Sequence, residues 1–155
     1  MGEAMDLKLR QGAWVVVCDG RKSIVLENIG DEEYPDLRTR DAAEGDNAPT
    51  SAIGADRPGR VHQSVGEERS AVEQTDWHDR EEDEFLRILA ARLDAAVVAK
   101  EVTHLVIVAP PRALGMIRRA YTPRVREAIL AEIDKDLVRH PVGDIEKHLL
   151  GDRRR

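Results

Sequence analysis

Two short runs of mostly β-branched residues, Trp14–Cys18 and residues 23–27, flank the tetrapeptide Asp19-Gly20-Arg21-Lys22. Aspartate followed by glycine readily takes the positive φ angles of a tight hairpin turn. The pattern therefore predicts an antiparallel β-hairpin near the N-terminus. A third, weaker strand is expected over residues 34–39. Its Pro35 belongs at a strand end or a sheet edge, because proline cannot donate to the ladder.

Residues from about 40 to 75 show no hydrophobic periodicity and are rich in glycine, proline and small polar side chains. A segment of this composition buries too little apolar area to offset the entropy lost on ordering, so a mobile loop is expected. Loops of this length inside a domain are uncommon and often functional.

A long helix is expected from about residue 77 to residue 100, and its first turns are acidic, which is the favourable sign at a helix N-terminus. Its predicted apolar stripe consists of Phe85, Leu86, Ile88, Leu89, Ala90, Leu93, Ala96 and Val97. Residues 104–109 then form an almost continuous apolar run, as buried parallel strands do, and Pro110-Pro111 ends it.

The remaining chain predicts two helical pieces, one strand and one closing helix. The first piece covers residues 113–121, and the second restarts at Thr122 as N-cap with Pro123 at the first helical position. A last edge strand is expected over residues 132–138. The closing helix begins near Pro141 and ends at Gly151, and residues 151–155 form a basic tail.

This order of elements predicts one α/β domain over residues 8–150. Three meander strands, followed by two strands reached through helical crossovers, give a mixed five-stranded sheet. Right-handed crossovers place the fourth strand beside the first, which predicts the order 3-2-1-4-5 with helices on both faces. This is the layout of a ribonuclease H-like domain.

Composition narrows the class of protein. A chain of 155 residues suits one domain, and with 3% aromatic residues its core must be mostly aliphatic. No apolar run approaches the roughly 20 residues of a membrane span. The acidic N-terminus does not read as a secretion signal, so a cytoplasmic protein is expected. The lone Cys18 excludes an intrachain disulfide and a multi-cysteine zinc site.

Residues suited to catalysis are sparse. Asp19 ends the first strand, where a metal-dependent nuclease of this layout would hold one ligand, but the fourth strand ends without a carboxylate. His78 and Glu82 share a helix face without the His-Glu-x-x-His spacing of a zinc site. No serine stands in a Gly-x-Ser-x-Gly context. We therefore assign no catalytic residue, no metal ligand and no cofactor.

One charge asymmetry stands out, because five arginines follow the fourth strand before any acid appears: Arg112, Arg118, Arg119, Arg124 and Arg126. Ligands of open α/β sheets bind beyond the carboxyl ends of the strands. A positive patch there would hold phosphate or RNA, with Arg57 and Arg60 of the loop joining it. The alternative is a set of solvated side chains that pair with the abundant aspartates and glutamates.

Three stretches resemble the bacterial host-attachment protein family: Ala109-Pro110-Pro111-Arg112-Ala113-Leu114-Gly115-Met116-Ile117-Arg118, Lys135-Asp136-Leu137, and Asp144-Ile145-Glu146-Lys147-His148-Leu149. The opening strand, Pro58-Gly59-Arg60 and residues 85–93 fit the same pattern. The resemblance covers about residues 8–150, and it implies a role in the attachment of bacteria to host cells.

That family is similar in layout to the middle domain of archaeo-eukaryotic peptide-chain release factors. In those domains the long loop carries a Gly-Gly-Gln sequence that enters the peptidyl-transferase centre of the ribosome. Here the loop reads Arg57-Pro58-Gly59-Arg60-Val61-His62-Gln63-Ser64-Val65-Gly66, without Gly-Gly-Gln. The resemblance therefore implies contact with the ribosome or RNA rather than peptidyl-tRNA hydrolysis.

These observations predict a non-enzymatic binding protein whose loop and arginine-rich sheet end contact the ribosome, other RNA or a protein of the attachment pathway. The expected contact residues are Arg60, His62, Gln63, Arg112, Arg118 and Arg119. The alternative is an enzyme, either a release-factor-like peptidyl-tRNA hydrolase or a metal-dependent nuclease.

Overall fold

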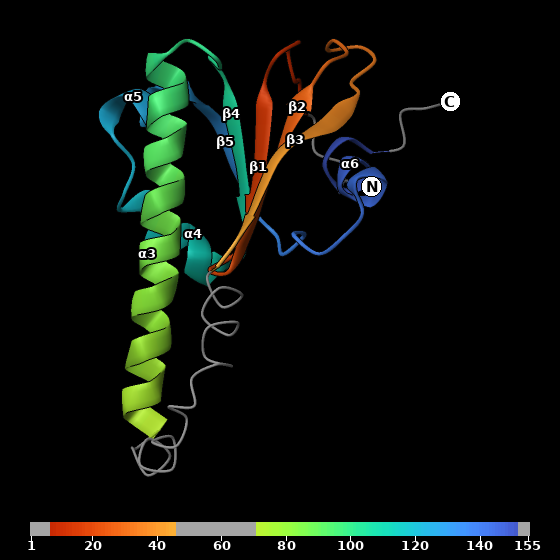
Figure 1. Ribbon diagram of the computed structural model, residues 1–155. Helices are drawn as coiled ribbons and strands as arrows, with labels where there is room; N and C mark the ends of the chain where they lie inside the picture. The colour runs from red at the N-terminus through yellow and green to blue at the C-terminus, as the bar shows by residue number, and fades with distance from the viewer. Residues whose placement is uncertain (1–6, 46–70, 152–155) are drawn as a thin grey trace, which may run out of the picture.

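The computed structural model describes residues 7–45 and 71–151, with side chains from residue 77 onward in the second range. Five strands form one sheet in the order β3-β2-β1-β4-β5 (Figure 1). The strand β1 pairs antiparallel with β2 and parallel with β4, while β3 and β5 are the edges. The predicted mixed sheet and its order are confirmed. The strands are β1 (Trp14–Cys18), β2 (Lys22–Asn28), β3 (Leu37–Glu44), β4 (Leu105–Ala109) and β5 (Ile129–Asp134).

Helices cover both faces of this sheet, as predicted (Figure 1). Alternate strand residues point to opposite faces, so Val16 and Ile107 pack in one core while Val15 and Val106 pack in the other. No helix of the described residues combines the length and the apolar character that crossing a membrane requires. The first face carries α3 (Ala71–Val98), α4 (Pro111–Arg118) and α5 (Pro123–Ala128), and the second carries α6 (Val142–Leu150).

The third strand is longer than its sequence indicates. It starts at Leu37 and continues to Glu44, through polar residues that the sequence assigned to the loop. Pairing explains this extension, because β3 is hydrogen-bonded along all of β2, from Asn28↔Leu37 to Lys22↔Glu44, across a bulge. Strand formation depends more on such neighbours than on intrinsic preference. The helix α3 also begins before its expected start, and residues 46–70 lie outside the described residues.

The predicted position of the last strand, residues 132–138, was wrong. The strand β5 is Ile129–Asp134, because α5 ends at Ala128 and its C-cap residue Ile129 is already extended. The residues of β5 pair with β4 in parallel register. The register shifts once, at a bulge between Leu105 and Val106. Leu137 and Val138, which follow the strand, pack in the core under α6.

The β1–β2 turn forms as predicted but through a different conformation. The Oδ1 atom of Asp19 accepts hydrogen bonds from the backbone N–H groups of Arg21 and Lys22, each at 2.8 Å. Gly20 does not have a positive φ. Glycine is needed there for another reason, since a Cβ at this position would lie 2.7 Å from Cγ of Glu82. The turn therefore packs directly against α3.

Cys18 is expected to be inert in the folded protein. Burial raises the pKa of its thiol to about 12, and the neighbouring Asp19 carboxylate acts in the same direction. Since the thiolate is the reactive form, DTNB should modify the native protein at mildly alkaline pH only as fast as the chain opens. In guanidinium chloride the reaction should be fast. Equally fast modification of the folded protein would contradict this assignment and indicate that β1 opens locally.

Candidate functional site

The segment that carries the arginines is shaped by its buried residues. The helix α4 starts directly after β4, with Pro111 at its first position, and it buries Ala113, Leu114 and Ile117. Met116 also packs against the core, whereas Arg112 and Arg118 lie toward solvent. Thr122 caps α5, because its hydroxyl accepts a hydrogen bond from the backbone N–H of Val125. The arginine side chains are therefore displayed by two short, well-anchored helices.

Arg112, at the carboxyl end of β4, is bound to α3. Its Nη2 donates to the carboxylate of Asp79 and lies 3.0 Å from Oε1 of Glu82, to which its Nε also donates. The hydrogen bonds that Arg112 donates to these two carboxylates, first Asp79 and then Glu82, raise its pKa. The guanidinium thus joins the start of α4 to α3, close to the β1–β2 turn that contacts Glu82.

Arg118 belongs to a second cluster, which is built around the Tyr121 ring. Its guanidinium lies 2.8 Å from Oε1 of Glu132, whose other oxygen accepts a hydrogen bond from the Tyr121 hydroxyl at 3.0 Å. Burial raises the pKa of Tyr121, and the charge of Glu132 adds to this shift. Arg126 lies over the Tyr121 ring, 5.8 Å from its centroid, and donates to the carbonyl of Arg118.

Arg124 is paired as well. Its Nε lies 2.9 Å from Oδ1 of Asp94, which also accepts a hydrogen bond from the Thr122 hydroxyl at 2.7 Å. The Thr122 bond and then the Arg124 bond lower the pKa of Asp94. Arg112, Arg118 and Arg124 thus pair with carboxylates, as the alternative to a phosphate-binding patch predicted. In the part of the chain that the structure describes, no carboxylate forms an ion pair with Arg119 or Arg126.

The arginines that the sequence grouped together lie in two places. Arg118 follows Arg112 by six positions in α4, a helical rise of about 9 Å. Figure 1 shows α4 near one end of the strands and α5 near the opposite end of α3. Arg126 donates a hydrogen bond to the carbonyl of Arg118, and Arg119 directly follows Arg118 as the C-cap of α4; we call these three residues the arginine group. The other predicted contact residues, Arg60, His62 and Gln63, lie outside the described residues.

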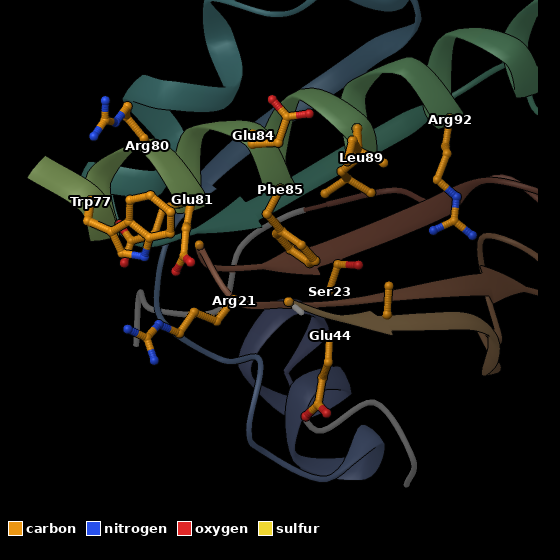
Figure 2. A pocket seen from close by; sticks show the side chains of 15 residues that line it. Arg21, Ser23, Glu44, Trp77, Arg80, Glu81, Glu84, Phe85, Leu89 and Arg92 are labelled. Atoms are coloured by element: carbon orange, nitrogen blue, oxygen red, sulfur yellow. The ribbon is translucent and has the colours of Figure 1, made fainter. Parts of the chain in front are cut away.

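A pocket that the sequence did not reveal lies between α3 and the strands β2 and β3, with a volume of about 590 Å³ (Figure 2). Its α3 side includes Trp77 and Ile88, which are 56% and 51% exposed. The sequence had placed Ile88 in the core stripe of the helix, and this was wrong. Ile88 lies at the edge of that stripe, where helical periodicity alone does not separate a core position from a pocket wall.

The carboxylates and histidines do not gather into an ion site. In residues 7–45 and 77–151, no group of three or more His, Cys, Asp or Glu side chains is placed to hold a metal ion. Asp19 holds its turn, and Glu82 binds Arg112.

Residues 12–149 match the family model described as "Bacterial archaeo-eukaryotic release factor family 12". The chain belongs to this family. The release-factor-like layout inferred from sequence is thereby confirmed, whereas host attachment forms no part of that description.

The family 12 chain is similar to a curated protein and to a solved structure. It is 32% identical over 75 residues to "Uncharacterized protein RP470" of Rickettsia prowazekii (strain Madrid E), a match of 47% of this chain and 50% of that one. The crystal structure of the archaeal translation termination factor aRF1 aligns with a TM-score of 0.48 at 9% identity, over 88% of this chain and 34% of that one. The chain thus spans about half the length of the curated relative and about a third of the aRF1 chain.

Proposed function

We propose that this family 12 chain is a non-enzymatic binding protein that contacts RNA, in the setting of the ribosome, through the arginine group. Membership of a release factor family supports the translational setting, which would be cytoplasmic. The observation that carries the RNA contact is the display of Arg118, Arg119 and Arg126 together on α4 and α5. Two of the three have no carboxylate partner among the described residues.

Phosphate contacts are the chemistry that suits this group. Guanidinium groups bind phosphate through paired hydrogen bonds. Arg118 is engaged with Glu132 at a half-exposed position, and such surface ion pairs are worth only about 0–1 kcal/mol. Because the Glu132 carboxylate also repels phosphate, we expect Arg118 to contribute less than Arg119 and Arg126. The Tyr121 ring is 8% exposed, which leaves little surface for base stacking. Binding is therefore expected to be salt-sensitive and weakly selective for sequence.

The other predicted contacts take different places in this proposal. Arg112 would first have to leave Asp79 and Glu82, so we expect it to contribute less than Arg118. Arg60, His62 and Gln63 remain proposed contacts in residues 46–70.

The test is a double substitution, Arg119→Ala with Arg126→Ala. Neither arginine pairs with a carboxylate of the described residues, so the change breaks no ion pair among them. Fluorescence anisotropy with a labelled single-stranded RNA should show binding weakened about tenfold at low salt. The plot of the logarithm of the association constant against the logarithm of the salt concentration has a negative slope. The magnitude of this slope should decrease by about 1.4, because two phosphate contacts of single-stranded RNA are lost.

The matched control is Arg38→Ala with Arg87→Ala, which removes the same charge from β3 and from the outer side of α3. Its effect on RNA binding should stay within about twofold, since only general charge repulsion changes. Equal losses in the two double variants, or no loss in either, would refute the arginine group as the RNA contact.

A protein of a host-attachment pathway is the alternative partner, and the resemblance of residues 109–118, 135–137 and 144–149 supports it. Affinity purification from cells with and without nuclease distinguishes the two partners. Ribosomal proteins that disappear after nuclease treatment would favour RNA, and envelope proteins that persist would favour attachment. A release-factor-like hydrolase would instead require turnover of peptidyl-tRNA that the substitution Gln63→Ala abolishes.

A further inference from the structure

The pocket between α3 and the strands β2 and β3 has one wall built by helical spacing. Trp77, Glu81, Phe85 and Leu89 follow one another at four-residue intervals, so they lie along one side of α3. Figure 2 shows these side chains directed toward the strands, where Ser23 and Ala43 contribute to the opposite wall. The volume of about 590 Å³ falls within the roughly 300–1,000 Å³ range of ligand pockets.

Two apolar side chains that line the pocket have no covering element among the described residues. Trp77 is 56% exposed and Ile88 is 51% exposed, although both are large and apolar. Exposed apolar side chains that gather at a concave site mark interaction surfaces more often than isolated ones do. The pocket is therefore a candidate contact surface, and its charges indicate what it would contact.

Most of the charged groups around the pocket are already engaged or point elsewhere. Glu82 binds Arg112, and Arg92 binds Asp41 at 2.7 Å. Figure 2 shows Glu84 and Arg80 directed away from the pocket.

The exceptions are Arg21, an exposed residue of the β1–β2 turn that lines the pocket, and Glu81. Glu81 points into the pocket between Trp77 and Phe85. No cation of the described residues forms an ion pair with it. A carboxylate flanked by two aromatic rings is suited to a cation, which gains from the ion pair and from the ring faces together. The same carboxylate repels phosphate, and an uncharged apolar ligand would remove it from water without compensation.

A second groove extends the pocket along the helix. It shares Ser23, Leu89 and Arg92 with the first and continues to Ala96. From Trp77 to Ala96 the helix rises about 28 Å, which matches an extended peptide of about eight residues. An elongated groove of this length fits a peptide segment better than it fits a compact small molecule.

We propose that this pocket binds a segment of a partner protein that presents a lysine or arginine side chain between apolar residues. The cationic head would meet Glu81 and the Trp77 ring, while its aliphatic stem and the flanking apolar residues would cover Phe85 and Ile88. This site lies apart from the arginine group and does not depend on the RNA proposal.

The experiment uses the two tryptophans of the chain as reporters. Trp77 is exposed at the pocket and Trp14 is 5% exposed beneath the adjoining groove, so their indole N–H signals in a two-dimensional NMR spectrum report on different places. The probe is a capped Ala-Leu-Lys-Leu-Ala peptide, and its counterpart carries glutamate in place of lysine. The lysine peptide should shift the Trp77 signal in a saturable way, and the glutamate peptide should not.

The variant Glu81→Gln removes the charge and keeps the shape, and it should weaken binding of the lysine peptide about fivefold. Its control is Glu84→Gln on the same helix, whose side chain points away from the pocket and pairs with Arg87; this change should stay within about twofold. Both positions are exposed, so the fold should be retained.

Four outcomes would overturn the proposal. The first two are equal binding of the two peptides and equal effects of the two substitutions. The third is a single-stranded RNA that shifts the Trp77 signal at a lower concentration than the peptide does. The fourth is a change in the Trp77 signal that is reversed when the protein alone is diluted. The third outcome would make RNA the occupant, and the fourth would make it a second copy of the chain.

Discussion

Replacing Asn28 with alanine should lower the free energy of unfolding by about 3–4 kcal/mol, because a fully buried side chain would lose several hydrogen bonds at once. Asn28 ends β2 and has 0% of its surface exposed. Its Nδ2 donates to the carbonyl of Leu9 at 2.9 Å, and its Oδ1 accepts from the backbone N–H groups of Gly30 and Asp36 at 3.0 and 2.8 Å. One amide thus joins the N-terminal segment to the β2–β3 turn.

Alanine cannot replace these bonds, and each backbone group left buried without a partner costs about 1–3 kcal/mol. A loss of this size corresponds to a fall in Tm of about 10 °C for a chain of this length. Urea unfolding followed by circular dichroism measures it. Gln11→Ala is the matched control, because Gln11 also donates an amide hydrogen bond in this region but from an exposed position; its effect should stay below about 0.5 kcal/mol. A loss below about 1 kcal/mol for Asn28→Ala would contradict the assigned role.

The second large effect is expected for Leu86→Ala. Leu86 has 0% of its surface exposed and packs in the core beside Val16 and Ile107, which α3 covers. Removing its side chain should cost about 3 kcal/mol, from lost burial and from the cavity that remains. Thermal and urea unfolding of the purified variant give the value.

Ile88→Ala is the comparison, because it lies two residues further along the same helix and is 51% exposed at the pocket. Its cost should be below about 1 kcal/mol. Equal costs at the two positions would mean that α3 is rotated about its axis relative to the structure. The wall formed by Trp77, Glu81 and Phe85 would then be lost, so this pair of variants also tests the pocket.

The sheet order could be derived from sequence because each step depends on local signals. The apolar run of β1, the Asp19 turn and the apolar run of β4 stopped by Pro110 each identify one element. The handedness of crossovers then leaves one arrangement. The ends of the elements were harder to predict from the sequence. The extension of β3 to Glu44, for example, is decided by its pairing with β2 and not by its own polar residues.

The candidate sites could be predicted from the sequence only in part, for a related reason. The sequence showed five arginines in a row of helical segments, but it could not show that Asp79, Glu82 and Asp94 of α3 would reach Arg112 and Arg124 from about 30 residues away. It also left unrecognised the importance of Asn28, whose partners come from two separate segments, and the pocket beside Glu81.

The sequence by itself determined the alternation of strands and helices, the parallel core strand and the mostly aliphatic interior, because these follow from periodicity and from the preferences of neighbouring residues. Only the tertiary structure decided which arginines are neutralised, which side of α3 stays open and which polar groups are buried. Those outcomes depend on contacts between residues far apart in the chain, and the free energy of such a contact is set by the geometry that packing imposes on both partners.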